Sequence, residues 1–174
     1  MAVESHKIKD KIIDYLKGSV IEIGCGDETI IDGVFGVDGR KFPCVNFVTD
    51  NLYDLPIQLL SRVNSFDCCF SSHTLEHLPD SYRCIIEWSE FVKPNGYFVL
   101  YLPDGEYYDN YENREHFHDT TYKQFLFWFK RTFCGEALNF KGEQYQKPLF
   151  ELIEHGQDVG DNRYSFYLVA KKIG

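Results

Sequence analysis

Long apolar runs and positive charge are both scarce in this sequence. No segment approaches the roughly 20 apolar residues that a membrane-spanning helix requires, and residues 1–11 are polar and charged, which predicts no signal peptide. The chain has 18 Lys and Arg residues and 27 Asp and Glu residues, which gives a net charge of -9. Nucleic acids and anionic membranes attract positive surfaces. We therefore expect a cytoplasmic protein with no nucleic-acid partner and no membrane insertion.

Cysteine pairs at the spacing of zinc or redox motifs are also lacking. The six cysteines include no Cys-x-x-Cys pair, and their spacings match no zinc site. Cys68 and Cys69 lie inside an apolar segment, where a free cysteine behaves as a small hydrophobic residue. We predict that the thiols are reduced and structural.

The apolar residues that are present suffice for one core. The chain has 174 residues, of which 44% are hydrophobic and 17% aromatic, a composition that favours a packed globule over disorder. A chain of this length suits one domain, and no repeat or linker divides the sequence. We expect a single domain over residues 1–174.

Strand-like and helix-like patterns alternate along the chain. Ile8, Ile12 and Leu16 form the apolar stripe of an N-terminal amphipathic helix. Further helices are predicted over Asp80–Val92 and after a capping box at Thr121–Gln124. The predicted strands are Val20–Ile23, Val34–Val37, Val45–Val48, Phe66–Phe70, Tyr97–Leu102, Leu149–Glu154 and Ser165–Lys171. This alternation indicates an α/β fold with a mostly parallel sheet covered by helices on both faces.

In such a sheet, ligands bind beyond the carboxyl ends of the strands. The first predicted strand ends in a Gly-Cys-Gly turn at residues 24–26, where glycine permits a tight turn and the close approach of a ligand. A dinucleotide site would have a third glycine where Thr29 stands. Asp27 and Glu28 place negative charge where a pyrophosphate would lie. Because these acids repel an anion, a cationic sulfonium amino acid is the more favourable ligand.

Acidic residues end the next two predicted strands. Asp38 can accept hydrogen bonds from both hydroxyls of a ribose, and Asp50 can accept one from an adenine amine. Each acid alone is common as a solvated end to a strand. Their order after the glycine turn points to a cofactor that combines a nucleoside with a cationic group.

The segments that carry these residues resemble, in order and spacing, the class I S-adenosylmethionine-dependent methyltransferase family. The matching segments are Val20–Gly26, Gly36–Asp38, Asp50–Pro56, Phe66–Leu78 and Val92–Pro103. The block from Phe66 to Leu78, followed by Val92–Gly96, is especially similar to the small methyltransferases of type 11, and the resemblance covers residues 15–105. It implies a Rossmann-like sheet of seven strands in the order 3-2-1-4-5-7-6, with the seventh strand antiparallel, and S-adenosyl-L-methionine as the cofactor.

The resemblance also implies a role for each residue of the cofactor site. The implied cofactor residues are Glu22, Gly24, Cys25 and Gly26 for methionine, Asp38 and Gly39 for ribose, Asp50, Asn51 and Leu52 for adenine, and Ser71, Ser72 and His73 beside the sulfonium. The chain departs from the family at Glu28, where glycine is usual. The helices after Gly26 and Asp38 are also abbreviated, so we expect thin cover on that part of the sheet.

Two histidines are candidates for proton transfer. His116 and His118 follow the fifth predicted strand, and an imidazole suits a general base near neutral pH. Asp119 can orient such a ring. The alternative is a solvated histidine that caps the helix beginning near Thr121. Four aromatic residues of the same segment are candidates for stacking on a sugar or a flat acceptor, namely Tyr107, Tyr108, Tyr111 and Phe117.

His73, Glu76 and His77 are spaced to share one side of a predicted helix start. Some O-methyltransferases of ubiquinone biosynthesis are similar here and hold a divalent metal with acidic and histidine residues at such positions. The alternative is that these side chains brace the junction between strand and helix by hydrogen bonds. We favour bracing, and predict no metal.

The function expected from these features is S-adenosylmethionine-dependent methyl transfer to a small-molecule or glycan acceptor, at oxygen. With no room for a large lid, the acceptor site would be open or completed by a second subunit of a homodimer. The alternative is a binding or regulatory protein that keeps the fold and lacks catalysis. A nicotinamide-dependent reductase is disfavoured, because Tyr167 and Lys171 would lie about 13 Å apart on a strand that rises about 3.3 Å per residue.

Overall fold

The computed structural model describes residues 4–108, 115–137 and 147–174. The helices are α1 (Glu4–Ile12), α2 (Leu55–Gln58), α3 (Ser81–Ser89) and α4 (Tyr122–Phe133), with 3-10 turns η1 (Ile13–Tyr15), η2 (Leu60–Arg62) and η3 (Leu75–His77). The strands are β1 (Val20–Ile23), β2 (Phe35–Asp38), β3 (Val45–Val48), β4 (Phe66–Ser72), β5 (Val92–Pro103), β6 (Phe150–Gly160) and β7 (Arg163–Lys172).

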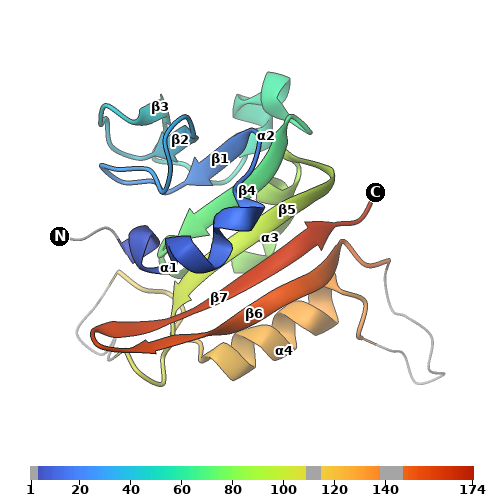
Figure 1. The fold of residues 1–174 in the computed structure, drawn as a ribbon. Helices are drawn as coiled ribbons and strands as arrows, with labels where there is room; N and C mark the ends of the chain where they lie inside the picture. The colour runs from blue at the N-terminus through green and yellow to red at the C-terminus, as the bar shows by residue number, and fades with distance from the viewer. Residues whose placement is uncertain (1–3, 109–114, 138–146) are drawn as a thin grey trace.

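The strands form one seven-stranded sheet in the order β3-β2-β1-β4-β5-β7-β6. Strands β1 to β5 pair in parallel, and β7 lies antiparallel between β5 and β6 (Figure 1). The predicted Rossmann-like order and the antiparallel seventh strand are confirmed. Because the chain moves outward from β1 to β3 and then returns to β4 on the other side, the order reverses between β1 and β4. A ligand site is expected beyond the carboxyl ends of these two strands.

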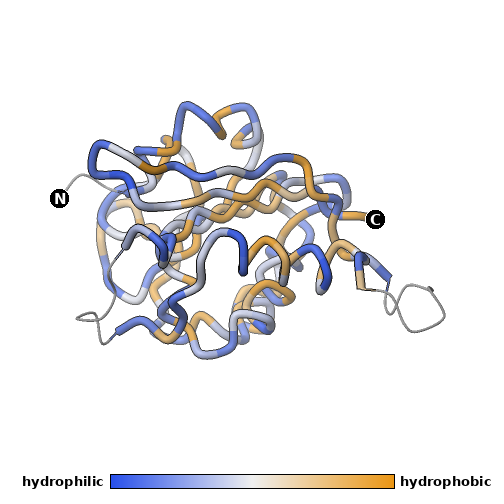
Figure 2. Tube along the Cα trace, turned by 90° about the horizontal axis from the view of Figure 1, so that it is seen from below, coloured by the Kyte–Doolittle hydropathy of each residue, from blue (hydrophilic) through white to orange (hydrophobic). Residues whose placement is uncertain are grey.

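Each face of the sheet has its own apolar core. On one face, Ile8 and Ile12 of α1 pack with Phe70 of β4. On the other face, Trp88 of α3 and Phe129 of α4 belong to a larger cluster. Figure 1 shows α1 in front of the strands and α3 behind them, and Figure 2 shows hydrophobic stretches concentrated in the middle of the molecule. Helices on both faces are thus confirmed, with α1 the only long helix on its face among the described residues.

Local sequence signals set the starts of α3 and α4. The Thr121 hydroxyl accepts from the Gln124 N–H, and the Gln124 side chain accepts from the Thr121 N–H, so the predicted capping box of α4 is confirmed. The side chain of Asp80 caps α3. That helix ends at Ser89 rather than Val92, because the chain from Val92 onward pairs with β4 in the sheet.

The connections between β1, β2 and β3 are short and lack the crossover helices that the family resemblance implies. Residues 24–34, between β1 and β2, contain no helix, and neither do residues 39–44, between β2 and β3. The helices expected to be abbreviated are therefore absent from these two connections. Strand β3 is consequently only partly buried along its length.

The last two strands are longer than predicted. Asp161 and Asn162 adopt φ of 45° and 67° between them, as a two-residue hairpin turn requires. Strand β6 therefore continues past its predicted end at Glu154 to Gly160, and β7 begins at Arg163, before its predicted start at Ser165. In the described parts of the chain, we find no helix with the length and apolar character needed to cross a membrane.

Candidate functional site

The turn after β1 brings predicted cofactor residues to the carboxyl end of the sheet. Gly24 and Gly26 have φ of 76° and 64°, in the left-handed region that glycine adopts without steric cost. The N–H groups of Gly24 and Cys25 donate to the Val37 carbonyl at 2.8 and 3.2 Å, which holds the turn against β2. A Cβ atom on Gly24 would collide with Thr74, whereas one on Gly26 would meet nothing within 4 Å. Gly26 therefore borders open space.

Glu22 lies beneath this turn. Its side chain is buried, and its carboxyl group accepts a hydrogen bond from the Ile30 N–H at 2.8 Å. Burial raises the pKa of Glu22 to about 8, against the opposing effect of the Ile30 N–H. The contact indicates that Glu22 shapes the loop after Gly26 from inside.

Asp38 ties the end of β2 to the glycine turn. One carboxylate oxygen accepts from the Gly26 N–H and the other from the Arg40 N–H, both at 2.9 Å. A carboxylate has about four acceptor positions. Two positions are thus left for further donors, as a ribose with two hydroxyls would need.

The segment after β3 supplies the outer end of the site. A Cβ atom on Gly39 would lie 3.9 Å from the Cα of Asp50, so these two residues are neighbours. Asp50 and Asn51 are exposed and Leu52 is half-buried. The Trp88 indole N–H donates to the Leu52 carbonyl at 2.9 Å and fixes the backbone there. The structure therefore places the predicted adenine residues beside the predicted ribose residues.

The end of β4 closes the inner side. The Ser71 hydroxyl donates to the Ile23 carbonyl at 2.9 Å, and the buried Ser72 hydroxyl has no hydrogen-bond partner among the described residues. His73 has φ of 48°, and its Nε2 lies 3.0 Å from the Ser165 hydroxyl. Burial, followed by the charges of nearby Lys and His side chains, lowers the pKa of His73 to about 3, so its ring is neutral at ordinary pH.

These residues suit a cofactor with a cationic amino-acid end and a nucleoside end. The open space at Gly26 admits a ligand, Asp38 retains acceptor positions for hydroxyl groups, and Ser72 has an unused buried hydroxyl. The atypical Glu28 lies on the side of α1, where its carboxylate is 3.8 Å from the Nε2 atom of His6.

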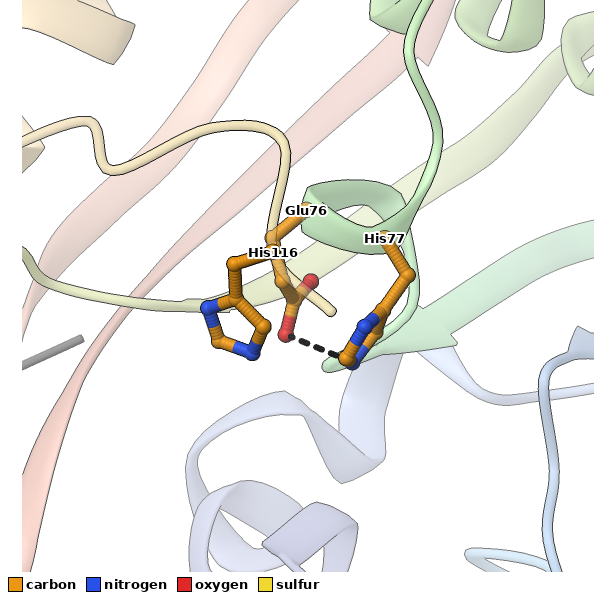
Figure 3. Close-up of side chains that lie close together, drawn as sticks. All are labelled: Glu76, His77 and His116. Carbon is orange, nitrogen blue, oxygen red and sulfur yellow. Dashed lines mark ion pairs between the residues drawn. The ribbon is translucent and has the colours of Figure 1, made fainter. Parts of the chain in front are cut away.

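Glu76, His77 and His116 form a second group of polar side chains (Figure 3). One ligand atom from each lies within 4.8 Å of the others. The carboxylate of Glu76 is buried, and its Oε1 atom is 4.0 Å from Nε2 of His77. Burial raises the pKa of Glu76 to about 8, against the opposing effect of its own backbone N–H. Burial and then His77 lower the pKa of His116, against the opposing charge of nearby acids.

His118 lies on the wall of a cavity of about 370 Å³. Its Nε2 atom is 2.9 Å from the Leu78 carbonyl and 3.1 Å from the Pro79 carbonyl. Carbonyl oxygens only accept hydrogen bonds, so Nε2 carries the proton and the neutral ring has its lone pair on Nδ1. None of the predicted cofactor residues lines this cavity, which extends along η3, α3, α4 and the end of β5.

The aromatic residues of the segment after β5 take different positions. Tyr107 and Phe117 are mostly exposed. Tyr108 stacks on Tyr164 of β7, with ring centroids 4.6 Å apart. Tyr111 lies outside the described residues. The aromatic walls of the cavity come instead from Tyr82, Phe125 and Trp128.

Thr74 is the site residue that sequence reasoning missed. Its hydroxyl donates to the Ser72 carbonyl at 3.0 Å, and its side chain occupies the space that a Cβ on Gly24 would need. Only the contact with the distant glycine turn distinguishes this residue from other threonines, so no local pattern could have found it.

Comparisons with known proteins give a family match for part of the chain. The family model described as "Methyltransferase domain", Methyltransf_11, matches residues 21–100. A comparison with curated protein sequences finds no significant match.

Several solved structures share the fold. An S-adenosylmethionine dependent methyltransferase from Mesorhizobium loti is 13% identical with a TM-score of 0.65, and the match covers 98% of this chain and 99% of that one. The Burkholderia thailandensis 1,6-didemethyltoxoflavin-N1-methyltransferase, solved with its small-molecule ligand and S-adenosylhomocysteine, is 13% identical with a TM-score of 0.67, over 99% and 79% of the two chains. A chain from the Haloferax volcanii complex of the Trm112 methyltransferase activator and a proposed methyltransferase is 12% identical with a TM-score of 0.65, over 98% and 91%.

The fold and the family match define a Rossmann-like methyltransferase domain. Residues 21–100 match the methyltransferase domain of type 11, and the strand order is the one that the resemblance to class I S-adenosylmethionine-dependent methyltransferases implies. The cofactor of this class is S-adenosylmethionine.

Proposed function

We propose that this chain is an active enzyme that methylates a small-molecule or saccharide acceptor, at a hydroxyl oxygen. The observation that carries this proposal is the cavity beside His118. It lies along η3, and the residue just before η3, Thr74, packs on the Gly24 turn. An acceptor in the cavity would therefore be adjacent to the end of the sheet where the cofactor residues gather.

Side chains of the cavity have the chemistry that such a transfer needs. S-adenosylmethionine, when bound, supplies an electrophilic methyl group. Methyl transfer to a hydroxyl also requires alignment of the acceptor and removal of its proton. We assign proton removal to Nδ1 of His118, because its Nε2–H is engaged by the two backbone carbonyls. His116 is the less favoured base, because its ring lies beside Glu76 and His77.

The acceptor class is proposed from the character of the cavity. Apolar and aromatic side chains, including Phe125 and Trp128, line it together with a few polar groups. Such walls suit a flat ring or the apolar face of a sugar. A small-molecule acceptor also agrees with the didemethyltoxoflavin methyltransferase of similar fold, although that enzyme methylates nitrogen.

A second candidate is a binding or regulatory protein without catalysis. The missing helices in residues 24–34 and 39–44 favour it, because they leave the nucleoside end of the site with less support. Isothermal titration with S-adenosylmethionine and S-adenosylhomocysteine, followed by a methyl-transfer assay on phenols, catechols and sugars, separates the candidates. We expect binding of both ligands and turnover on one acceptor class. Tight binding with no turnover on any class would favour the second candidate, and no binding would refute the first.

Three further properties belong to this proposal. We propose that residues 1–174 act as one methyltransferase domain. We also propose a cytoplasmic location, supported by six cysteines that are all unpaired. A homodimer that completes the open site is proposed as well. Light scattering tests it, because the mass of one chain is 20.4 kDa and a dimer would have twice that mass.

A further inference from the structure

We propose that Glu76, His77 and His116 bind one divalent transition-metal ion, with Zn²⁺ as the representative ion. Glu76 and His77 belong to η3, and His116 comes from a separate segment that lies against it. Figure 3 shows the three side chains converging. The inference is independent of methyl transfer, since the same site could serve an enzyme or a binding protein.

The first argument is the environment of Glu76. Its side chain is only 4% exposed, and both carboxylate oxygens lack a hydrogen-bond partner among the described residues. The nearby basic atoms are ring nitrogens, Nδ1 of His73 at 3.7 Å and Nε2 of His77 at 4.0 Å from Oε1. A buried carboxyl group without a donor is costly. A cation bound between the carboxylate and the rings would remove that cost.

The second argument is the orientation of His77. Its Nδ1 atom lies 3.1 Å from the Glu115 carbonyl. The carbonyl can only accept, so Nδ1 carries the proton and Nε2 has the lone pair. Nε2 is also the atom nearest Glu76. A histidine that ligates a metal through one nitrogen commonly donates its other N–H to a backbone carbonyl, which fixes the ring.

The third argument is the position of His116. Its side chain is 5% exposed, and Nδ1 lies 3.9 Å from a carboxylate oxygen of Asp119. Figure 3 shows the other ring nitrogen on the side of Glu76. The Phe117 N–H donates to the Glu76 carbonyl at 2.8 Å, which holds this segment against η3. At 3.9 Å Asp119 makes no hydrogen bond with Nδ1, and that buried nitrogen has no hydrogen-bond partner among the described residues. The ring is therefore held by packing and not by a polar partner, which leaves it able to turn toward a cation beside Glu76.

The set of ligands selects the class of ion. Two imidazoles and one carboxylate suit Zn²⁺ and its first-row neighbours, whereas Ca²⁺ and Mg²⁺ prefer oxygen ligands. Zinc bonds to such ligands are about 2.0–2.2 Å long. The ligand atoms lie within 4.8 Å of one another, so small side-chain rotations would bring them to one ion and leave a position open for water or a ligand.

The test is metal binding by the full chain without an affinity tag. Chelator-treated protein is titrated with Zn²⁺ by calorimetry, for the natural chain and for E76Q, H77Q and H116Q. The matched control is H155Q, because His155 contacts Tyr122 and lies outside the group. Circular dichroism checks that each variant folds. We expect one Zn²⁺ per chain, at least tenfold weaker binding in the three variants, and unchanged binding in H155Q.

Two further readouts make the result decisive. Co²⁺ in place of Zn²⁺ should give a spectrum without thiolate bands, because no cysteine belongs to the group. Zn²⁺ should also slow hydrogen exchange of the Phe117 N–H in the natural chain and not in E76Q. Absence of a stoichiometric site, a thiolate spectrum, or natural affinity in all three variants would overturn the proposal. These outcomes do not depend on whether S-adenosylmethionine binds or reacts.

Discussion

Gly26 and Gly33 have nearly the same backbone conformation, but only Gly26 belongs to the predicted cofactor site. Their φ angles are 64° and 78°, and a Cβ atom on either would meet nothing within 4 Å. An alanine in the left-handed region costs about 1–2 kcal/mol, so G26A and G33A should lose similar stability in urea unfolding. Only G26A would place a methyl group in the open space of the proposed cofactor site.

We therefore expect S-adenosylmethionine affinity to fall at least tenfold in G26A and to stay within about twofold in G33A, measured by calorimetry. Tenfold corresponds to about 1.4 kcal/mol. Equal affinity in the two variants would show that the cofactor does not lie at Gly26.

His118 is the residue on which the proposed chemistry depends most. H118A should lower the methyl-transfer rate about 100-fold or more, the usual contribution of general base catalysis, while calorimetry shows unchanged S-adenosylmethionine affinity. The matched control is H155A, which removes a histidine from β6, far along the chain from the cavity wall. A full rate in H118A would remove His118 from the mechanism.

At the scale of elements, α4 depends on its capping box. Thr121 and Gln124 exchange hydrogen bonds between side chain and backbone at 3.3 and 3.1 Å. T121A leaves N–H groups of the first turn without that partner, which typically costs about 1 kcal/mol. Urea unfolding should show that loss with an unchanged slope against urea concentration. K123A, at an exposed position of the same helix, should change stability by less than about 0.5 kcal/mol; a similar loss there would argue against the cap.

The elements themselves were largely predictable from sequence. Apolar runs located every strand of the sheet, and the alternation with helices indicated the α/β class. The ends were less predictable: β6 and β7 extend to the turn at Asp161 and Asn162 because pairing with each other, rather than burial of both faces, sustains them there. The predicted end of α3 was too late, because Val92 pairs with Phe66 of β4 instead of continuing the helix.

At the scale of the whole molecule, the buried Glu22 makes stability depend on pH. Its pKa is about 8 in the folded chain and 4.5 in the reference state. Between these values the unfolded chain has released this proton and the folded chain still holds it, so stability falls as pH rises from 4.5 to 8. The shift corresponds to a loss of about 5 kcal/mol.

E22Q should lack this component, because glutamine does not ionise and its carbonyl can still accept from the Ile30 N–H. Urea unfolding at several pH values from 5 to about 8 should show a flatter profile in E22Q than in the natural chain. E151Q, at an exposed position, should keep the natural slope. Parallel profiles for E22Q and the natural chain would contradict the raised pKa.

The sequence by itself determined the class of fold and predicted where the cofactor residues would gather. Asp38 ends a recognisable strand, Gly26 and Asp50 come shortly after two others, and parallel strands bring their carboxyl ends to one edge of a sheet. The order of strands and strand-end residues in the sequence was therefore enough to predict that these three residues lie at one edge of the sheet. The same logic placed the segment with His118 near that edge, because it follows β5.

Only the tertiary structure decided which distant side chains touch. Thr74 packs on Gly24, and His116, from a separate segment, joins Glu76 and His77. His73 lies between two partners, with Nδ1 3.7 Å from Oε1 of Glu76 and Nε2 3.0 Å from the Ser165 hydroxyl. The physical reason is that periodicity reports which face of an element is buried, whereas these contacts arise between loops whose paths depend on packing of the whole sheet. Hydrogen bonds such as that from Phe117 N–H to the Glu76 carbonyl then fix the pairing.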